Sequence, residues 1–469
     1  MFYHWLETQR AWMRSVDAWT ALAAASWGAL PACAHAADTS QSSEARLAAA
    51  PPGCDWVFRL LQAAREPPPF AIDSVQIEGR SVPVVETVVD RTAFCALRRF
   101  ARQFDVPAAA PRTGERQRGA HRTTSARRID KSTSRGGARL SHDAANGTGR
   151  PSVLLVAPLA GHHAVMLRET VQTLLEDADV YVTDWANARD VPLAHGRFDL
   201  DDYVLAVERF LRPLAPGGVH VLAICQAAPP ALAAAALAAT ANDGSAPLSV
   251  TLMGGPIDTR SHPTMIDRVA ATHDVEWFRR TVIDTVPPGY PGAGRRIYPG
   301  YLQHAAIVAA HPHRQWGLET QYWASRFSGS AAAIASSQRA LDEYCSVLDM
   351  DEDYFLDTLC TVFQEQRLAR GSWSVGERRV RPEALTATAL CTVEGDRDDI
   401  AGTGQTHAAH GLCVAVADAE RMCLTVDDCD HYDLFTGPRW REVIHPALRR
   451  FWLANERDRS PPFFLEPKR

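Results

Sequence analysis

The sequence predicts an α/β protein: a mostly parallel sheet with helices on both faces and an inserted helical cap. Between residues 151 and 260, short runs of consecutive apolar residues alternate with segments whose apolar residues recur at helical spacing. A strand that is apolar throughout is buried on both faces, which is typical of parallel sheets. The alternation of such strands with helices favours the same architecture.

The first part of the predicted sheet domain covers residues 151–260. Its elements are, in order, a strand at 152–159 (SVLLVAPL), a helix at 164–175, a strand at 179–185 (DVYVTDW), a helix at 199–214, a strand at 219–225 (VHVLAIC), an alanine-rich helix at 226–240 and a strand at 248–258 (LSVTLMGGPID). Asp199 and Asp201 suit the N-terminal end of their helix, because the helix dipole favours carboxylates there.

The alternation stops near residue 261 and resumes near residue 385. Residues 261–384 carry many tryptophans and tyrosines on mostly helical patterns, and we interpret them as the cap. The run LTATALCTVEGDRDDI (385–400) then restores the strand pattern. A helix rich in small and polar residues should follow, then a weak strand at 413–417 or 422–426. Residues 385–455 therefore form the second part of the sheet domain.

Three further segments lie outside this pattern. We expect residues 1–105 to be a helical or extended region that packs on the core, and residues 456–469 to be a C-terminal tail. The apolar stretch Ala21–Ala37 has the composition of a signal peptide, but Glu7 and Asp17 precede it where a signal peptide needs a cationic region.

Residues 106–150 form the third of these segments and are rich in Pro, Gly, Ser, Thr and Arg. From Arg112 to Arg150 the segment holds ten basic and three acidic residues and almost no bulky apolar ones. It has too little apolar surface to build a core, which predicts a disordered linker or insertion. The alternative is a basic tether to an anionic surface or partner.

Composition excludes several classes of function. With 46% hydrophobic and 22% charged residues in 469, the chain has the composition of a soluble globular protein. Its net charge of −6 argues against general nucleic-acid binding, and no apolar run reaches the roughly 20 residues of a transmembrane helix. The ten cysteines include no Cys-x-x-Cys pair, so we expect reduced thiols and a cytoplasmic protein.

One of these cysteines, Cys225, lies where a predicted strand turns into a helix. Reactive groups of parallel sheets lie at this end of the strands, and the helix amides beside them favour negative charge. The sequence Ala223-Ile224-Cys225-Gln226-Ala227 corresponds to the Gly-x-Ser-x-Gly nucleophile elbow, with alanines in place of both glycines. A buried structural cysteine is the alternative interpretation.

The order of residues along the chain favours the catalytic interpretation. An α/β-hydrolase presents its nucleophile, then an acid, then a histidine. After Cys225 come three aspartates behind a late strand, of which Asp398 is the preferred acid and Asp399 the alternative, and then His431 on a loop near the end. The sequence therefore predicts a Cys225–Asp398–His431 triad on an α/β-hydrolase fold.

Acyl transfer also requires hydrogen-bond donors for the oxyanion. We expect the backbone amide of Gln226 to be one donor. The other should come from Leu159 or Ala160, in the loop after the first strand. His162, in the same loop, either hydrogen-bonds substrate or shapes the loop.

Taken together, these segments resemble the intracellular polyhydroxybutyrate depolymerase family, whose members use a cysteine where lipases have a serine. The matching pieces, in order, are YHWLETQRAW, LLVAPLAGHHAVMLRETV, DVYVTDWANARDVPLAHGRFDLDDYV, VLAICQ, TLMGGPIDTR, YPGYLQ, EYCSVLDMDEDYFLDTLCTVF, TVEGDRDDIAGTGQT and HYDLFTGPRWREVIHP. They cover most of the chain outside residues 106–150.

The resemblance implies a polyester hydrolase with Cys225 as nucleophile, Asp398 as acid and His431 as base. It implies no metal or organic cofactor, and it implies polyhydroxybutyrate, its granule surface and hydroxybutyrate oligomers as partners in the cytoplasm. The sequence departs from the family at Ala227-Ala228, at the basic insertion and at Asp430 and Asp433, which flank the histidine. A carboxylate beside His431 would raise its pKa.

Two other functions remain open. Polyhydroxyalkanoate synthases share the fold, the cysteine and a similar sequence texture, although glycines normally surround their cysteine. A catalytically impaired granule-binding protein would keep the polymer contacts without the chemistry. Release of 3-hydroxybutyrate from polymer separates the depolymerase from both.

Overall fold

The structure is a computed structural model that describes residues 67–103 and 150–456. Three expectations from the sequence lie outside the described residues: the helical spacing and possible signal peptide at the N-terminus, the basic insertion at 106–150 apart from its last residue, and the C-terminal tail at 456–469 apart from its first residue.

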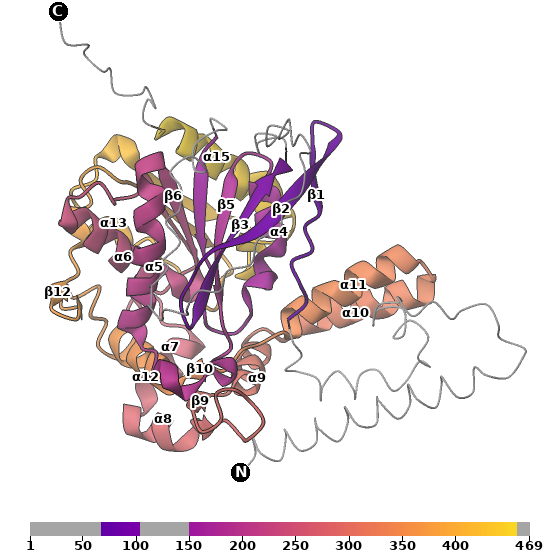
Figure 1. The fold of residues 1–469 in the computed structure, drawn as a ribbon, viewed down its shortest axis with the longest axis horizontal. Helices are drawn as coiled ribbons and strands as arrows, with labels where there is room; N and C mark the ends of the chain where they lie inside the picture. Colours follow the sequence, from indigo (N-terminus) through magenta and orange to yellow (C-terminus); the bar gives the residue numbers. More distant parts are fainter. Residues whose placement is uncertain (1–66, 104–149, 457–469) are drawn as a thin grey trace, which may run out of the picture.

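Within the described residues, a nine-stranded sheet forms the centre of the molecule (Figure 1). Its spatial order is β1-β2-β3-β5-β4-β6-β7-β13-β14. The strands are β1 (Ser74–Ile77), β2 (Arg80–Arg91), β3 (Cys95–Arg102), β4 (Ser152–Val156), β5 (Asp179–Trp185), β6 (Val219–Ile224), β7 (Ser249–Met253), β13 (Ala389–Gly395) and β14 (Arg421–Val426). Strands β5, β4, β6, β7, β13 and β14 run parallel to one another. Strand β1 pairs antiparallel with β2, β2 with β3, and β3 with β5.

The central parallel strands are buried on both faces. Every residue of β6, β7 and β13 is buried, and so are the last four residues of β4. Helices α5 (Leu200–Leu214) and α6 (Ala228–Ala241) lie on one face, and α4 (Arg168–Leu174) and α15 (His445–Ala454) lie on the other (Figure 1). These layers confirm the predicted doubly covered sheet.

The strand order and directions are those of an α/β-hydrolase. Strand β6, which ends next to Cys225, lies in the middle of the parallel sheet, and β13 and β14, which precede Asp398 and His431, lie together at one edge. Because β6, β13 and β14 run parallel, their carboxyl ends meet at the same rim of the sheet. The fold class predicted from the sequence is therefore confirmed.

The N-terminal region contributes strands to the sheet itself. Residues 1–105 were expected to form a helical or extended region that packs on the core. The described part of this region forms β1 to β3, which extend the sheet beyond β5. At the other edge of the sheet, the predicted weak strand is β14, which covers the second of its two predicted positions, 422–426. The helix expected after residue 400 is reduced to turns and the short α13 (Ala409–Leu412).

Residues 261–384, predicted as the cap, are mostly helical. They hold α7 (Met265–Thr272), α8 (Val275–Thr281), α9 (Gly300–Ala310), α10 (Pro312–Ser328), α11 (Ala331–Cys345) and α12 (Glu352–Thr358). They also hold short strands: β8 (Asp284–Thr285), β9 (Arg296–Tyr298) and β10 (Met350–Asp351) form one small sheet, and β11 (Ser374–Val375) and β12 (Arg378–Arg379) form a hairpin. Helices α10 and α11 pack against each other and project from the body of the molecule (Figure 1).

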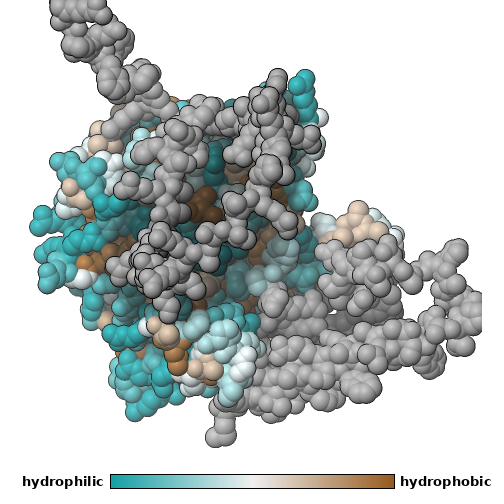
Figure 2. Space-filling view, in the orientation of Figure 1, coloured by the Kyte–Doolittle hydropathy of each residue, from teal (hydrophilic) through white to brown (hydrophobic). Residues whose placement is uncertain are grey.

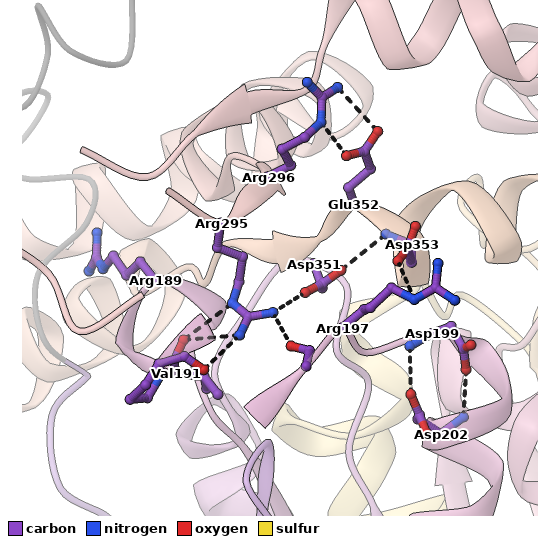
Figure 3. Close-up of polar contacts among 12 residues, drawn as sticks. Arg189, Val191, Arg197, Asp199, Asp202, Arg295, Arg296, Asp351, Glu352 and Asp353 are labelled. Carbon is purple, nitrogen blue, oxygen red and sulfur yellow. Dashed lines mark hydrogen bonds and ion pairs between the residues drawn. The ribbon is translucent and has the colours of Figure 1, made fainter. Parts of the chain in front are cut away.

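Arg295, next to β9, forms a buried ion pair with Asp351 of β10 in the same small sheet and also binds the core (Figure 3). Arg295 donates to Asp351 Oδ2 at 2.6 Å, and both side chains are at most 5% exposed. Its other N–H groups donate to the backbone carbonyls of Val191, Pro192 and Gly196, which precede α5 in the core. One side chain therefore joins the cap to the core.

On the face shown in Figure 2, most of the coloured surface is hydrophilic and apolar residues appear in scattered groups. Among the described residues, no helix has both the length and the apolar character that a membrane span needs.

Candidate active site

Cys225 lies on a sharp turn between β6 and α6. Its φ is +55°, a left-handed conformation that costs a residue with a side chain about 1 kcal/mol or more. Pro229 and Pro230 follow in the first turn of α6, where backbone N–H groups have no helical partner. The turn displays the thiol at the rim of the sheet, and Cys225 is one of the residues that line a cavity of about 380 Å³.

Small residues make this turn possible. Ala227 and Ala228 are fully buried, and Gly255 approaches them so closely that a Cβ at position 255 would lie 2.3 Å from the Cβ of Ala228 and 2.7 Å from the carbonyl oxygen of Cys225. The two alanines that replace the usual residues of the motif are therefore still compatible with a tight elbow.

Asp398 and His431 meet at the same rim. Asp398 follows β13 and His431 follows β14, and the distance from His431 Nδ1 to Asp398 Oδ2 is 2.8 Å. The other carboxylate oxygen of Asp398 accepts hydrogen bonds from the N–H groups of Ile400 and Ala401, both at 2.9 Å. Both side chains are at most 4% exposed, so the carboxylate is held in one orientation toward the imidazole.

A glycine leaves room for this pair. A Cβ at Gly254 would lie 2.6 Å from Leu434 Cδ1, 3.2 Å from Asp398 Oδ2 and 3.3 Å from His431 Cε1, and its φ of +58° also favours glycine. The double glycine after β7 therefore has a structural reason at each position: Gly255 admits the elbow and Gly254 admits the Asp–His pair.

His431 also forms a hydrogen bond with Cys225, and its charge state reflects both neighbours. Burial lowers the pKa of His431, but the Asp398 carboxylate and the Cys225 sulfur together outweigh burial and raise this pKa well above its usual value. The site therefore favours an imidazolium between a carboxylate and a sulfur that can hold negative charge.

The other nearby carboxylates bind groups other than the imidazole of His431. Asp399 is half exposed and lies 2.6 Å from His311 Nε2, whereas Asp396 accepts the N–H of Cys429 at 3.0 Å. Asp430 accepts the N–H groups of Tyr432 and Asp433 through one oxygen. Asp430 and Asp433 are not among the main groups that shift the pKa of His431, so these substitutions affect this pKa less than Asp398 and Cys225 do.

The expected oxyanion donors differ in their surroundings. Gln226 lies in the 3-10 turn that joins β6 to α6, and both it and Ala160 line the cavity, whereas Leu159 is buried and does not line it. The N–H of Ala160 already donates to the side-chain oxygen Oε1 of Gln226 at 3.0 Å. The next N–H, that of Gly161, donates to Gln303 Oε1 of the cap at 2.8 Å.

His162 lies in the same loop and is 8% exposed. Its Nε2 lies 3.0 Å from the hydroxyl of Tyr432, the residue after His431. Burial, with help from the nearby His304, lowers the pKa of His162 to about 3, so the ring is neutral at physiological pH. The contact with Tyr432 supports a role in shaping the loop, and its place on the cavity wall keeps a substrate contact open.

The cavity above these residues has a volume of about 380 Å³. Cys225, Gln226 and His431 lie on its wall together with the oxyanion loop. The cap contributes mainly apolar side chains: Met265, Ile266, Val269, Phe278, Ile307, Phe355, Leu359 and Phe363. A nucleophile, a base and an apolar acyl-sized space are the parts that ester hydrolysis requires.

Sequence reasoning missed two polar residues that organise this site, Gln303 and Tyr354. Both belong to segments quoted for the family resemblance, but nothing in their local pattern indicates a role. One local signal was present: two glycines, at 254–255, directly follow a buried strand. They could have indicated that the backbone there lies very close to the elbow at Cys225.

A family model matches the C-terminal part of the chain. The family described as "PHB de-polymerase C-terminus" matches residues 254–456, which include Asp398 and His431. No curated protein matches the chain.

Several solved structures are similar to the chain at low identity. A monoacylglycerol lipase of Paleococcus ferrophilus has 13% identity and a TM-score of 0.41, and the match covers 66% of this chain and 97% of the lipase. A putative lipase from Acinetobacter baumannii has 12% identity and a TM-score of 0.37 over 79% and 93%. A 2-hydroxy-6-oxo-6-phenylhexa-2,4-dienoate hydrolase from Rhodococcus sp. has 12% identity and a TM-score of 0.38 over 79% and 99%.

Proposed function

We propose that this chain, which belongs to the PHB depolymerase family and is a carboxylic ester hydrolase, cleaves poly(3-hydroxybutyrate) through a cysteine nucleophile. One observation carries the proposal: the thiol of Cys225 is hydrogen-bonded to His431, whose other ring nitrogen is 2.8 Å from Asp398. Nucleophile, base and orienting acid are thus in contact, in the chain order of an α/β-hydrolase.

The proposed reaction is acyl transfer in two steps. His431 accepts the proton of Cys225, and the sulfur attacks the carbonyl carbon of a polyester bond. Backbone amides at the elbow stabilise the oxyanion. When the tetrahedral intermediate collapses, His431 returns the proton to the departing hydroxyl group, and a 3-hydroxyacyl thioester remains on Cys225. Water, deprotonated by His431, then releases the acid and restores the thiol.

The surroundings of the triad support a polyester substrate. The cavity wall supplied by the cap is apolar, which suits the aliphatic backbone and methyl groups of poly(3-hydroxybutyrate). The products are 3-hydroxybutyrate or its short oligomers, and the partner is the polymer or its granule surface. We infer that the protein works on cytoplasmic granules.

Mass spectrometry of the intact protein tests the proposal. After brief incubation with 3-hydroxybutyrate trimer, we expect a 3-hydroxybutyryl adduct on the peptide that contains Cys225. The matched control is Cys360→Ala, which removes another partly exposed cysteine and should keep the adduct. Cys225→Ala should abolish both the adduct and the release of 3-hydroxybutyrate from amorphous polymer.

Each other result has a definite meaning. Undiminished polymer hydrolysis by Cys225→Ala would exclude the cysteine mechanism. Incorporation of 3-hydroxybutyryl-CoA into polymer would instead support a synthase. Polymer binding without any release would identify a granule-binding protein.

A further inference from the structure

The side chain of Gln226 joins three parts of the active site. Its Oε1 accepts two hydrogen bonds of 3.0 Å, one from the backbone N–H of Ala160 and one from the hydroxyl of Tyr354. A backbone N–H can only donate, so the oxygen end of the carboxamide must face the loop of Ala160. The nitrogen Nε2 therefore lies on the opposite side of the carboxamide.

Tyr354 donates the second hydrogen bond to Oε1 and supports this orientation, which the N–H of Ala160 sets. Tyr354 lies on α12 of the cap, is fully buried, and stacks on Tyr203 with ring centroids 5.6 Å apart. The hydroxyl of Tyr203 in turn donates to the carbonyl of Ala157 at the end of β4. Burial raises the pKa of Tyr354, so its hydroxyl stays protonated and remains a donor at any physiological pH. The carboxamide is thus fixed from both the core and the cap.

The nitrogen of this carboxamide is available to a ligand. Gln226 lines the cavity beside Cys225, and its Nε2 has no hydrogen-bond partner among residues 67–103 and 150–456. The other carboxamide on the wall, that of Gln303, is fully used: Oε1 accepts from Gly161, and Nε2 donates to the carbonyls of Tyr298 and Leu348. In a mainly apolar cavity, Nε2 of Gln226 is therefore a fixed donor next to the reacting sulfur.

We propose that Gln226 is a specificity-determining residue whose Nε2 donates to the oxygen on the third carbon of the acyl group attached to Cys225. In a 3-hydroxyacyl group this oxygen is two carbons beyond the thioester carbonyl, either as a free hydroxyl or as the start of the next ester. A simple fatty acyl group has only hydrogen there and leaves Nε2 unpaired. This inference rests on the proposed function and names the feature by which the site selects 3-hydroxyacyl esters.

Two esters that differ only in this oxygen provide the test: p-nitrophenyl 3-hydroxybutyrate and p-nitrophenyl butyrate. The measured quantity is the ratio of their kcat/KM values. Gln226→Glu keeps an oxygen that accepts from Ala160 and Tyr354 but replaces the donor with an acceptor. We expect this variant to lose about tenfold of the preference for the 3-hydroxy ester, the effect of one neutral hydrogen bond. Gln226→Met, which lacks donor and acceptor, should lose the preference as well.

Tyr354→Phe is the matched control. It removes one bond to Oε1 but leaves the N–H of Ala160 to orient the carboxamide, so both esters should slow alike and the ratio should stay within about twofold of that of the wild type. An unchanged ratio in Gln226→Glu and Gln226→Met would overturn the proposal. So would a Tyr354→Phe ratio that falls as far as that of Gln226→Glu, because the preference would then come from packing.

This experiment separates the inference from the proposed function. The soluble esters report on Gln226 without any polymer. If the wild-type protein hydrolyses them but releases no 3-hydroxybutyrate from amorphous polymer, the depolymerase proposal fails while the ratio still decides the role of Gln226.

Discussion

At the scale of single residues, Cys225, the proposed nucleophile, has a strained backbone conformation. A left-handed φ at a residue with a Cβ is unfavourable, and here the packed strand and helix on either side enforce it. The same turn brings the thiol to the rim of the sheet, where His431 can reach it. The strain is therefore a cost in stability that accompanies the display of the nucleophile.

A pair of substitutions measures that strain. Cys225→Gly and Cys225→Ala should both be inactive, but the glycine variant should have the larger free energy of unfolding, by about 1 kcal/mol, because glycine adopts positive φ without penalty. Urea unfolding of the two variants under one set of conditions gives the difference. Equal stabilities, or a more stable alanine variant, would mean that the turn is not strained in solution.

The contact with Asp398 raises the pKa of His431, the proposed base. Asp398→Asn removes the largest contribution that raises the pKa of His431, so burial should dominate and lower this pKa. We expect kcat to fall about 10³-fold or more, and the His431 ring to be neutral at pH 7 by NMR of the ring proton. Asp399→Asn is the control, since Asp399 faces His311, and its kcat should stay within a few-fold of wild type.

The same substitution predicts a pH dependence of stability. A histidine whose pKa is raised by folding stabilises the native state fully below its unfolded pKa of about 6.5 and loses this contribution as pH rises through the folded pKa. The advantage of wild type over Asp398→Asn should therefore be largest between about pH 5 and 6.5 and should decline at higher pH. An advantage that grows with pH would contradict a charged His431.

The sequence predicts that the three proposed catalytic residues lie close together, but it does not predict the side chains that surround them. Cys225, Asp398 and His431 were predicted because the carboxyl ends of parallel strands meet at one rim, so that order along the chain implies proximity. The role of Tyr354 was not predicted, because it depends on how the cap packs on the core. Position 226 was expected to contribute its backbone amide, and only the folded structure places its side chain.

At the scale of elements, the elements that were missed have weak local patterns. Strand β2 is largely exposed and rich in charged residues, and so lacks the apolar run that identified β4 and β6. The helix expected after residue 400 is replaced by turns in which Gly402 approaches the carbonyl of His262, where a Cβ would lie 2.0 Å from the oxygen. A close contact with the distant residue 262 cannot be inferred from the composition of residues 400–412.

The attachment of the cap can be tested at Arg295. Arg295→Met leaves Asp351 buried without its guanidinium partner and leaves three carbonyls without donors, so we expect a loss of about 3–5 kcal/mol in the free energy of unfolding. The neighbouring Arg296 is half exposed and binds Glu352 (Figure 3), which also binds Arg279. Arg296→Met should therefore cost less than about 1 kcal/mol.

Chemical denaturation of the two variants gives the comparison. Similar losses for Arg295→Met and Arg296→Met would show that Arg295 does not secure the cap. Adding Asp351→Leu to Arg295→Met should recover part of the loss, because the unpaired buried charge is then removed.

At the scale of the whole molecule, the residues that flank the basic insertion lie close together. Arg99 near the end of β3 and Arg150 just before β4 both bind the carboxylate of Asp179, at 3.0 and 3.5 Å. In the sheet, Phe100 is opposite Val180 and Ser152 is opposite Asp179, so one strand, β5, separates β3 from β4. A short connection could therefore replace residues 106–148 without moving either strand.

Replacing residues 106–148 with an eight-residue Gly/Ser linker should thus preserve the fold. The chain between β3 and β4 shortens from about 50 to about 15 residues, which should lower the entropic cost of closing it by about 1 kcal/mol. Thermal unfolding should be unchanged or slightly higher, and kcat/KM for p-nitrophenyl butyrate should match wild type. If the segment is only a linker, the release of 3-hydroxybutyrate from polymer should also be unchanged.

A fall in this release, with normal hydrolysis of the soluble ester, would instead indicate that the segment is the basic tether. In that case the difference between the wild type and the shortened protein should vanish at high salt, because salt screens the attraction of the wild-type segment to an anionic surface.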